Sequence, residues 1–161
     1  MMKQNKIPEI LAPAGSFEAV IAAVNSGADA VYLGQKSFSA RASAANFDAD
    51  ELVRATSICH RAGVKVYQAV NTVIFDNEFS ALELCIQTAC KAGVDAFIVQ
   101  DLGVMALLKR WAPEIPLHAS TQMSITSLSG VMQAAELGFK RAVLARELTL
   151  EEMKEIAALS P

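Results

Sequence analysis

The chain has 161 residues, of which 53% are hydrophobic and 19% are charged, and its net charge is −3. This composition supports a sizeable core and excludes an intrinsically disordered chain. It also argues against a nucleic-acid surface on this chain, because phosphate binding needs clustered Lys and Arg, so small or neutral partners are expected.

No secretory leader and no membrane span are expected. The first residues contain Pro8, Glu9 and Pro13 instead of an apolar run. The longest uncharged stretch, between Glu114 and Glu136, is rich in Ser, Thr and Gln. The three cysteines have no C-x-x-C spacing, and we interpret them as small core residues. We therefore expect a cytoplasmic protein.

The first predicted strand is Ile10–Ala14, and Ser16 is placed to cap the helix that follows. Gly27 ends this helix, because glycine readily adopts the left-handed conformation of a helix stop. The second predicted strand is Ala30–Leu33. A polar loop, QKSFSARASAANF, then leads to a helix that opens at Asp48 with capping-box spacing.

Four more units follow the same scheme. The remaining predicted strands are Val64–Val70, Ala96–Val99, Leu117–Ser120 and Ala142–Ala145. The remaining predicted helices are Glu78–Ala92, Val104–Trp111, a helix that turns Leu128, Val131 and Met132 inward, and a helix capped by Thr149 and Glu152.

Six strands and six helices therefore alternate, and the strands are apolar on both faces. This pattern indicates an α/β protein with a parallel sheet covered by helices. Two architectures remain open, a doubly wound sheet and a (β/α) barrel. The first strand turn, APAGS, lacks the G-x-G-x-x-G of a dinucleotide fold. A complete barrel has eight units and typically about 250 residues, so we expect a truncated barrel whose open edges allow homo-oligomer formation.

Seven stretches, in order along nearly the whole chain, resemble peptidase family U32, the collagenase-like proteases and their relatives. They are PEILAPAG, GADAVYLG, FSARA, VYQAVNT, GVDAFIVQDLG, LHASTQ and VLARELTLEEM. The resemblance implies that residues 1–161 are a single domain, the N-terminal part of a TIM-like barrel. It also implies that any iron–sulfur cluster is bound by cysteines of a later segment, with no metal or cofactor site in this one.

The resemblance implies two classes of activity. Some members of the family are assigned as peptidases, and others are needed for oxygen-independent hydroxylation of RNA nucleosides or of a quinone ring. The QDLG and HASTQ stretches are most similar to the RNA-hydroxylation members. We therefore expect this segment to support hydroxylation of a pyrimidine in tRNA or ribosomal RNA. The alternatives are a peptidase and a non-catalytic ligand-binding or assembly module.

Function in parallel barrels lies at the carboxyl ends of the strands. The fifth predicted strand ends in polar residues where a buried strand would use Val or Ile, namely His118, Ser120, Thr121 and Gln122. We expect His118 to act as an acid, a base or a ligand, unless it faces a helix. Ser120 and Gln122 could instead satisfy buried backbone groups.

Other polar residues at strand ends are candidates for ligand binding. They are Arg41, Asn71, Gln100, Asp101, Arg146 and Glu147. The arginines could bind an anion, whereas a solvated loop or an internal salt bridge is the plain explanation. Asn71 could be a turn residue, and Asp101 could cap the next helix. Together these residues predict a small anionic or aromatic ligand, with RNA or peptide reached only through a missing part.

The sequence does not identify a complete proteolytic site. Neither Ser120 near His118 nor any cysteine has a recognisable third partner, and no H-E-x-x-H is present. We expect the segment to be part of an enzyme and to be inactive alone.

Overall fold

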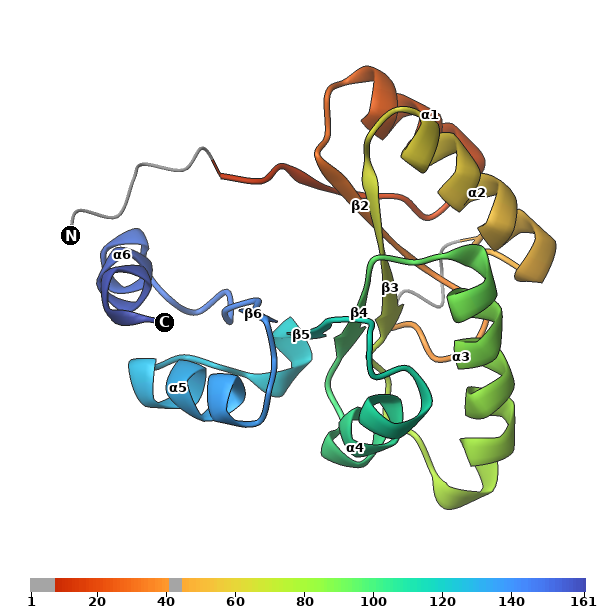
Figure 1. Cartoon of the computed structure of the whole chain (residues 1–161). Helices are drawn as coiled ribbons and strands as arrows, with labels where there is room; N and C mark the ends of the chain where they lie inside the picture. The colour runs from red at the N-terminus through yellow and green to blue at the C-terminus, as the bar shows by residue number, and fades with distance from the viewer. Residues whose placement is uncertain (1–7, 41–44) are drawn as a thin grey trace.

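The computed structural model describes residues 8–40 and 45–161 of the chain. Strands and helices alternate along it (Figure 1). The strands are β1 (Leu11–Pro13), β2 (Ala30–Gly34), β3 (Lys65–Val70), β4 (Ala96–Val99), β5 (Leu117–Ala119) and β6 (Arg141–Ala142). The α-helices are α1 (Phe17–Asn25), α2 (Ala49–Arg61), α3 (Phe79–Ala92), α4 (Leu102–Trp111), α5 (Leu128–Glu136) and α6 (Leu150–Leu159), with 3₁₀ turns η1 (Asp76–Glu78) and η2 (Thr121–Met123).

The six strands form one parallel sheet in the order β1-β2-β3-β4-β5-β6. Each strand pairs with the next one along the chain, so every connection is a βα crossover. Helices α1, α2 and α3 pack side by side along the outside of the sheet (Figure 1). The α/β, TIM-like fold predicted from the sequence is confirmed as six parallel βα units that form a half-barrel.

Local signals in the sequence set most of the helix ends. The Asp48 side chain accepts a hydrogen bond from the Glu51 backbone N–H, and the Glu51 carboxylate accepts one from the Asp48 N–H, which completes the predicted capping box. Thr149 and Glu152 do the same at α6. Gly93 ends α3 with φ of 79°, a conformation that disfavours residues with a Cβ.

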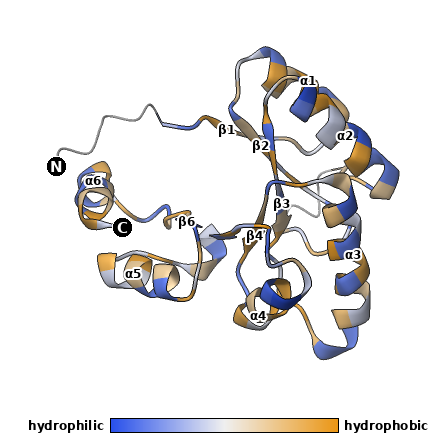
Figure 2. Ribbon diagram, in the orientation of Figure 1, coloured by the Kyte–Doolittle hydropathy of each residue, from blue (hydrophilic) through white to orange (hydrophobic). Residues whose placement is uncertain are grey.

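Alternate residues of the strands divide between an outer and an inner core. Outward-facing Val31, Val66 and Phe97 pack beneath the helices and are fully buried. The helices are banded in orange and blue in Figure 2, as expected when an amphipathic helix packs its apolar side on a sheet. The inner face carries a much smaller apolar cluster, Ala30, Tyr67, Ala96 and Ile98.

Two predictions about the last third of the chain were wrong in detail. Strand β6 covers Arg141–Ala142 and not Ala142–Ala145, because the Ala145 N–H donates to the Ile125 carbonyl instead of to β5 (3.0 Å). Met132 is 42% exposed, and Ala134 is the buried residue of α5. No helix in residues 8–40 and 45–161 is long and apolar enough to cross a membrane.

The open edges of the sheet predict self-association. Within the described residues, β1 and β6 each pair with only one neighbouring strand, which leaves backbone groups available to another chain. Light scattering over a dilution series should give an apparent mass above the 17.2 kDa of one chain that rises with concentration. A concentration-independent monomer would contradict the prediction.

Candidate functional site

A cavity of about 440 Å³ lies at the carboxyl ends of the strands. All six strands or the residues that directly follow them contribute to its wall. The wall consists of Leu11, Tyr32, Ala40, Ala69, Asn71, Ile98, Ser120, Thr121, Gln122, Val143, Leu144 and Arg146. This is the position at which parallel barrels place their functional residues.

Five of the predicted site residues meet at this cavity: Asn71, Ser120, Thr121, Gln122 and Arg146. Two of them are joined directly, since Asn71 Nδ2 donates to Ser120 Oγ at 3.2 Å. Ser120 Oγ also accepts from the Gln122 backbone N–H at 3.2 Å. Asn71 Oδ1 accepts from the Ala40 N–H at 3.1 Å, so the loop after β2 is tied to the end of β3. Hydrogen bonding thus holds the polar part of the wall in place.

Arg146 carries the one formal charge among the described residues of the wall. Its guanidinium can donate two parallel hydrogen bonds to a carboxylate or phosphate. Leu11, Ile98 and Val143 supply apolar surface to the same cavity, and Tyr32 supplies an aromatic ring. The arrangement suits a small ligand with an anionic group and an apolar or aromatic body.

His118 lies one layer below the cavity, towards the amino ends of the strands. It faces the inside of the sheet, is 6% exposed, and meets the Tyr67 ring edge to face at a centroid distance of 4.8 Å. Burial is the main cause that lowers the pKa of His118 from its ordinary 6.5 to about 4, and the positive charge of Arg141 acts in the same direction. The imidazole is therefore neutral at pH 7, and it is not itself part of the cavity wall.

Among the described residues, Gln100, Asp101 and Glu147 are not part of this cavity wall. The Asp101 side chain accepts from the Val104 N–H at 2.8 Å and so caps α4. Gln100 is half-buried, and Glu147 is exposed. Arg41 lies outside the described residues.

The apolar wall of the cavity was not predicted from the sequence. It includes Leu11, Tyr32, Ala69, Ile98 and Val143. The period of two along each strand is the signal that could have found them. Because these strands are apolar on both faces, the period alone does not say which alternate set faces inward.

The three cysteines are free thiols on α2 and α3. Burial raises the pKa of the Cys59 and Cys85 thiols to about 11, so both are protonated at neutral pH. Cys90 departs from the predicted core position, because it is exposed on α3. In the described part of the chain, no group of three or more His, Cys, Asp and Glu side chains could hold a metal ion.

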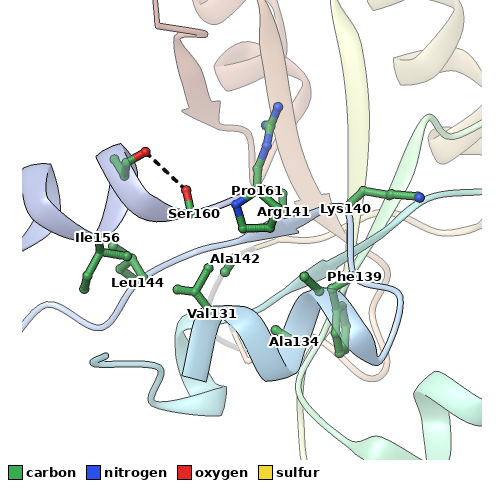
Figure 3. A pocket seen from close by; sticks show the side chains of 12 residues that line it. Val131, Ala134, Phe139, Lys140, Arg141, Ala142, Leu144, Ile156, Ser160 and Pro161 are labelled. Carbon is green, nitrogen blue, oxygen red and sulfur yellow. Dashed lines mark hydrogen bonds between the residues drawn. The ribbon is translucent and has the colours of Figure 1, made fainter. Parts of the chain in front are cut away.

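A second hollow, of about 240 Å³, lies between α5, β6 and α6 (Figure 3). Its walls are mainly apolar and include Val131, Phe139 and Ile156. The charged ends of Lys140 and Arg141 point away from these apolar side chains (Figure 3). The hollow therefore lies beside the edge of the sheet, apart from the cavity at the strand ends.

The low pKa of His118 predicts a pH-dependent stability. The unfolded chain takes up a proton near pH 6.5, whereas the folded chain resists protonation until about pH 4, so stability falls as the pH falls through this window. Moving from pH 7 to pH 5 should cost the wild type about 2 kcal/mol more than His118→Gln. Urea unfolding of both proteins at the two pH values measures this difference, and equal losses would contradict a buried, neutral His118.

The loop over the cavity predicts a steric requirement at Gly34. A Cβ added there would lie 2.3 Å from Ser39 Oγ and 2.4 Å from Ser39 Cβ. Gly34→Ala should therefore lower the free energy of unfolding by about 1–3 kcal/mol. In a double-mutant cycle, Ser39→Gly should recover most of that loss, and simple additivity would refute the clash.

The chain matches the family model for peptidase family U32 over residues 15–160. It is 37% identical to a 23S rRNA 5-hydroxycytidine synthase of Escherichia coli, with 92% of this chain and 22% of the synthase aligned. It is 36% identical to tRNA hydroxylation protein P1 of Bacillus subtilis, covering 93% of this chain and 36% of that protein. A collagenase of Porphyromonas gingivalis is 37% identical to this chain, and the alignment covers 92% of this chain and 35% of the collagenase.

Solved structures agree on the fold. A U32 peptidase structure superposes with a TM-score of 0.74 at 12% identity and covers 100% of this chain and 68% of that one. A 3-hexulose-6-phosphate synthase of Salmonella typhimurium has a TM-score of 0.68 at 14% identity, and the superposition covers 92% of this chain and 70% of the synthase. The chain spans 22% to 36% of the length of the three curated relatives named above. Because the family model matches nearly the whole length of this chain, the chain belongs to peptidase family U32.

Proposed function

We propose that this chain is the N-terminal barrel segment of a protein that supports oxygen-independent hydroxylation of a pyrimidine in tRNA or ribosomal RNA. The observation that carries the proposal is the cavity at the strand ends, where the Arg146 cation lies beside an apolar and aromatic wall. In this proposal the cavity binds a small anionic or aromatic ligand, and RNA is bound by parts of the protein outside these residues.

Similarity supports the hydroxylation class. Relatives named as tRNA hydroxylation proteins occur in Bacillus subtilis, Helicobacter pylori and Escherichia coli, at 31% to 37% identity. The relative from Escherichia coli named as a 23S rRNA 5-hydroxycytidine synthase is named for a hydroxylated cytidine, which is a pyrimidine nucleoside. The net charge of −3 is in keeping with RNA contacts made elsewhere in the protein. Our proposal places the reaction in the cytoplasm and assigns any iron–sulfur cluster to a segment beyond these residues.

A peptidase is the second candidate, because the collagenase relative is as similar as the hydroxylation proteins. The geometry of the described residues gives this candidate less support. Ser120 Oγ already accepts two hydrogen bonds, from Asn71 and from the Gln122 N–H. His118 packs against Tyr67. A third candidate, a binding or assembly module without catalysis, is compatible with the cavity alone.

The proposal predicts a missing modification in a deletion strain. Mass spectrometry of nucleosides from total tRNA and ribosomal RNA should show the loss of one hydroxylated pyrimidine when the gene is deleted, and the full-length gene should restore it. An unchanged nucleoside profile would overturn the proposal and favour the peptidase or a quinone-directed activity.

Complementation with variants tests the site in the same strain. Arg146→Ala should lower the hydroxylated nucleoside at least about tenfold, since it removes a charge-assisted contact to the ligand. Arg41→Ala tests the other predicted arginine and should abolish the modification without unfolding the protein. Arg110→Ala, an exposed arginine in the last turn of α4, is the matched control and should leave the modification unchanged.

A further inference from the structure

A layer of ionisable residues lies directly beneath the cavity. Alternate residues of a strand share a face, so each wall residue has a partner two positions earlier on the same face. The wall residues on or next to the strands are Leu11, Tyr32, Ala69, Ile98, Ser120 and Val143. The residues two positions earlier are Glu9, Ala30, Tyr67, Ala96, His118 and Arg141. This lower layer therefore combines two alanines with four polar or charged side chains.

The Glu9 carboxylate is the centre of this layer. Its Oε1 accepts a hydrogen bond from the Tyr67 hydroxyl at 2.9 Å and another from Arg141 Nη1. The Arg141 guanidinium also lies over the Tyr67 ring, 5.5 Å from its centroid. The hydrogen bond from Arg141 is the main cause that holds the pKa of Glu9 below its ordinary value, so the carboxylate is charged at neutral pH.

The alanines of the layer make this geometry attainable. Ala30 and Ala96 are fully buried in the same inner cluster as Tyr67, which is 2% exposed, and Ala96 is the residue paired with Tyr67 on the neighbouring strand. Larger side chains at these two positions would compete with the Tyr67 ring for the inside of the sheet. The ring is thus free to reach across the half-barrel towards Glu9.

These contacts connect the two edges of the sheet. Glu9 is separated from the start of β1 by Ile10 alone, Arg141 begins β6, and the two residues are 132 positions apart in the sequence. Strand β1 is held by β2, partly through the Asp29 and Ala30 N–H groups, which donate to the Ile10 carbonyl. Strand β6 has two paired residues and, in the part of the chain described, only β5 as a strand neighbour. The Glu9 contact is a second attachment for β6.

We propose that Glu9, Tyr67 and Arg141 form a brace that positions β6 across the half-barrel, and that Arg141 is thereby a positioning residue for the cavity wall. Val143, Leu144 and Arg146 follow Arg141 within five residues, and all three line the cavity. The brace sets where β6 leaves the sheet, and so it sets where Arg146 meets a ligand. The Arg141 guanidinium points away from the apolar hollow beside β6, as this role requires (Figure 3).

Hydrogen exchange in the intact protein, without any ligand, tests the brace. Arg141→Met should speed exchange of the Val143 and Ala145 amides about tenfold or more, because these amides report the opening of β6 from Ala119 and Ile125. Peptides from α2 and α3 should keep the wild-type rate. Glu9→Gln added to Arg141→Met should cause little further change, since both substitutions break the same contact.

Two other variants separate positioning from general stability. Lys65→Met is the matched control, because Lys65 Nζ is 3.9 Å from Glu9 and its side chain is 59% exposed, so exchange at β6 should not change. Arg141→Lys keeps the positive charge and a nitrogen that can donate to Glu9, so the Val143 and Ala145 amides should exchange more slowly than in Arg141→Met. Unchanged exchange at β6 in Arg141→Met would overturn the proposal. Equal acceleration throughout the chain, or an equal effect from Lys65→Met, would also overturn it. No ligand is needed, so the result is independent of the proposed hydroxylation.

Discussion

The whole structure depends on one constraint, that parallel strands buried on both faces must divide their alternate residues between two unequal cores. On the outside, residues such as Val66 and Phe97 fill the space beneath amphipathic helices. On the inside, Ala30, Ala69 and Ala96 keep the concave face open. Because the inner side chains are small, there is room for the Tyr67 and His118 rings in one layer and for a cavity in the next.

The two inner layers differ in chemistry. The upper layer has a hydrogen-bonded polar side built on Asn71 and Ser120, an apolar side, and one cation, Arg146. The lower layer contains a neutral imidazole and a charged pair shared by the edge strands. A ligand in the cavity therefore meets positive charge at the strand ends, whereas the charges beneath it largely neutralise each other. This difference favours anion binding at the carboxyl side of the sheet.

The named relatives of this chain include both RNA hydroxylation proteins and a collagenase, and the geometry of the cavity helps to choose between hydroxylation and proteolysis. Proteolysis needs an activated nucleophile with a base beside it. The buried thiols are protonated at neutral pH, and Ser120 Oγ serves the wall as a hydrogen-bond acceptor. The cavity at the strand ends lies next to a cation, Arg146, and the binding of a small ligand there would need no nucleophile. The proposed role in hydroxylation rests on that feature together with the relatives.

The sequence by itself determined the elements and their order, because helix caps, glycine stops and apolar runs are local signals. Asp48 with Glu51, Thr149 with Glu152, and Gly93 all act within one helical turn. It also placed Asn71 and Ser120 directly after strands, and parallel strands bring their ends together without further information; Arg146, by contrast, lies beyond the end of β6. The cap that Asp101 makes on α4 is likewise a local contact, and the sequence had predicted it as an alternative to ligand binding. Only the tertiary structure decided that Tyr32 and not Leu33 faces the cavity, and that His118 lies beneath it. The reason is that a strand apolar on both faces does not specify which face is inward, and that contacts such as Glu9 with Arg141, 132 residues apart, exist only after the sheet has curved.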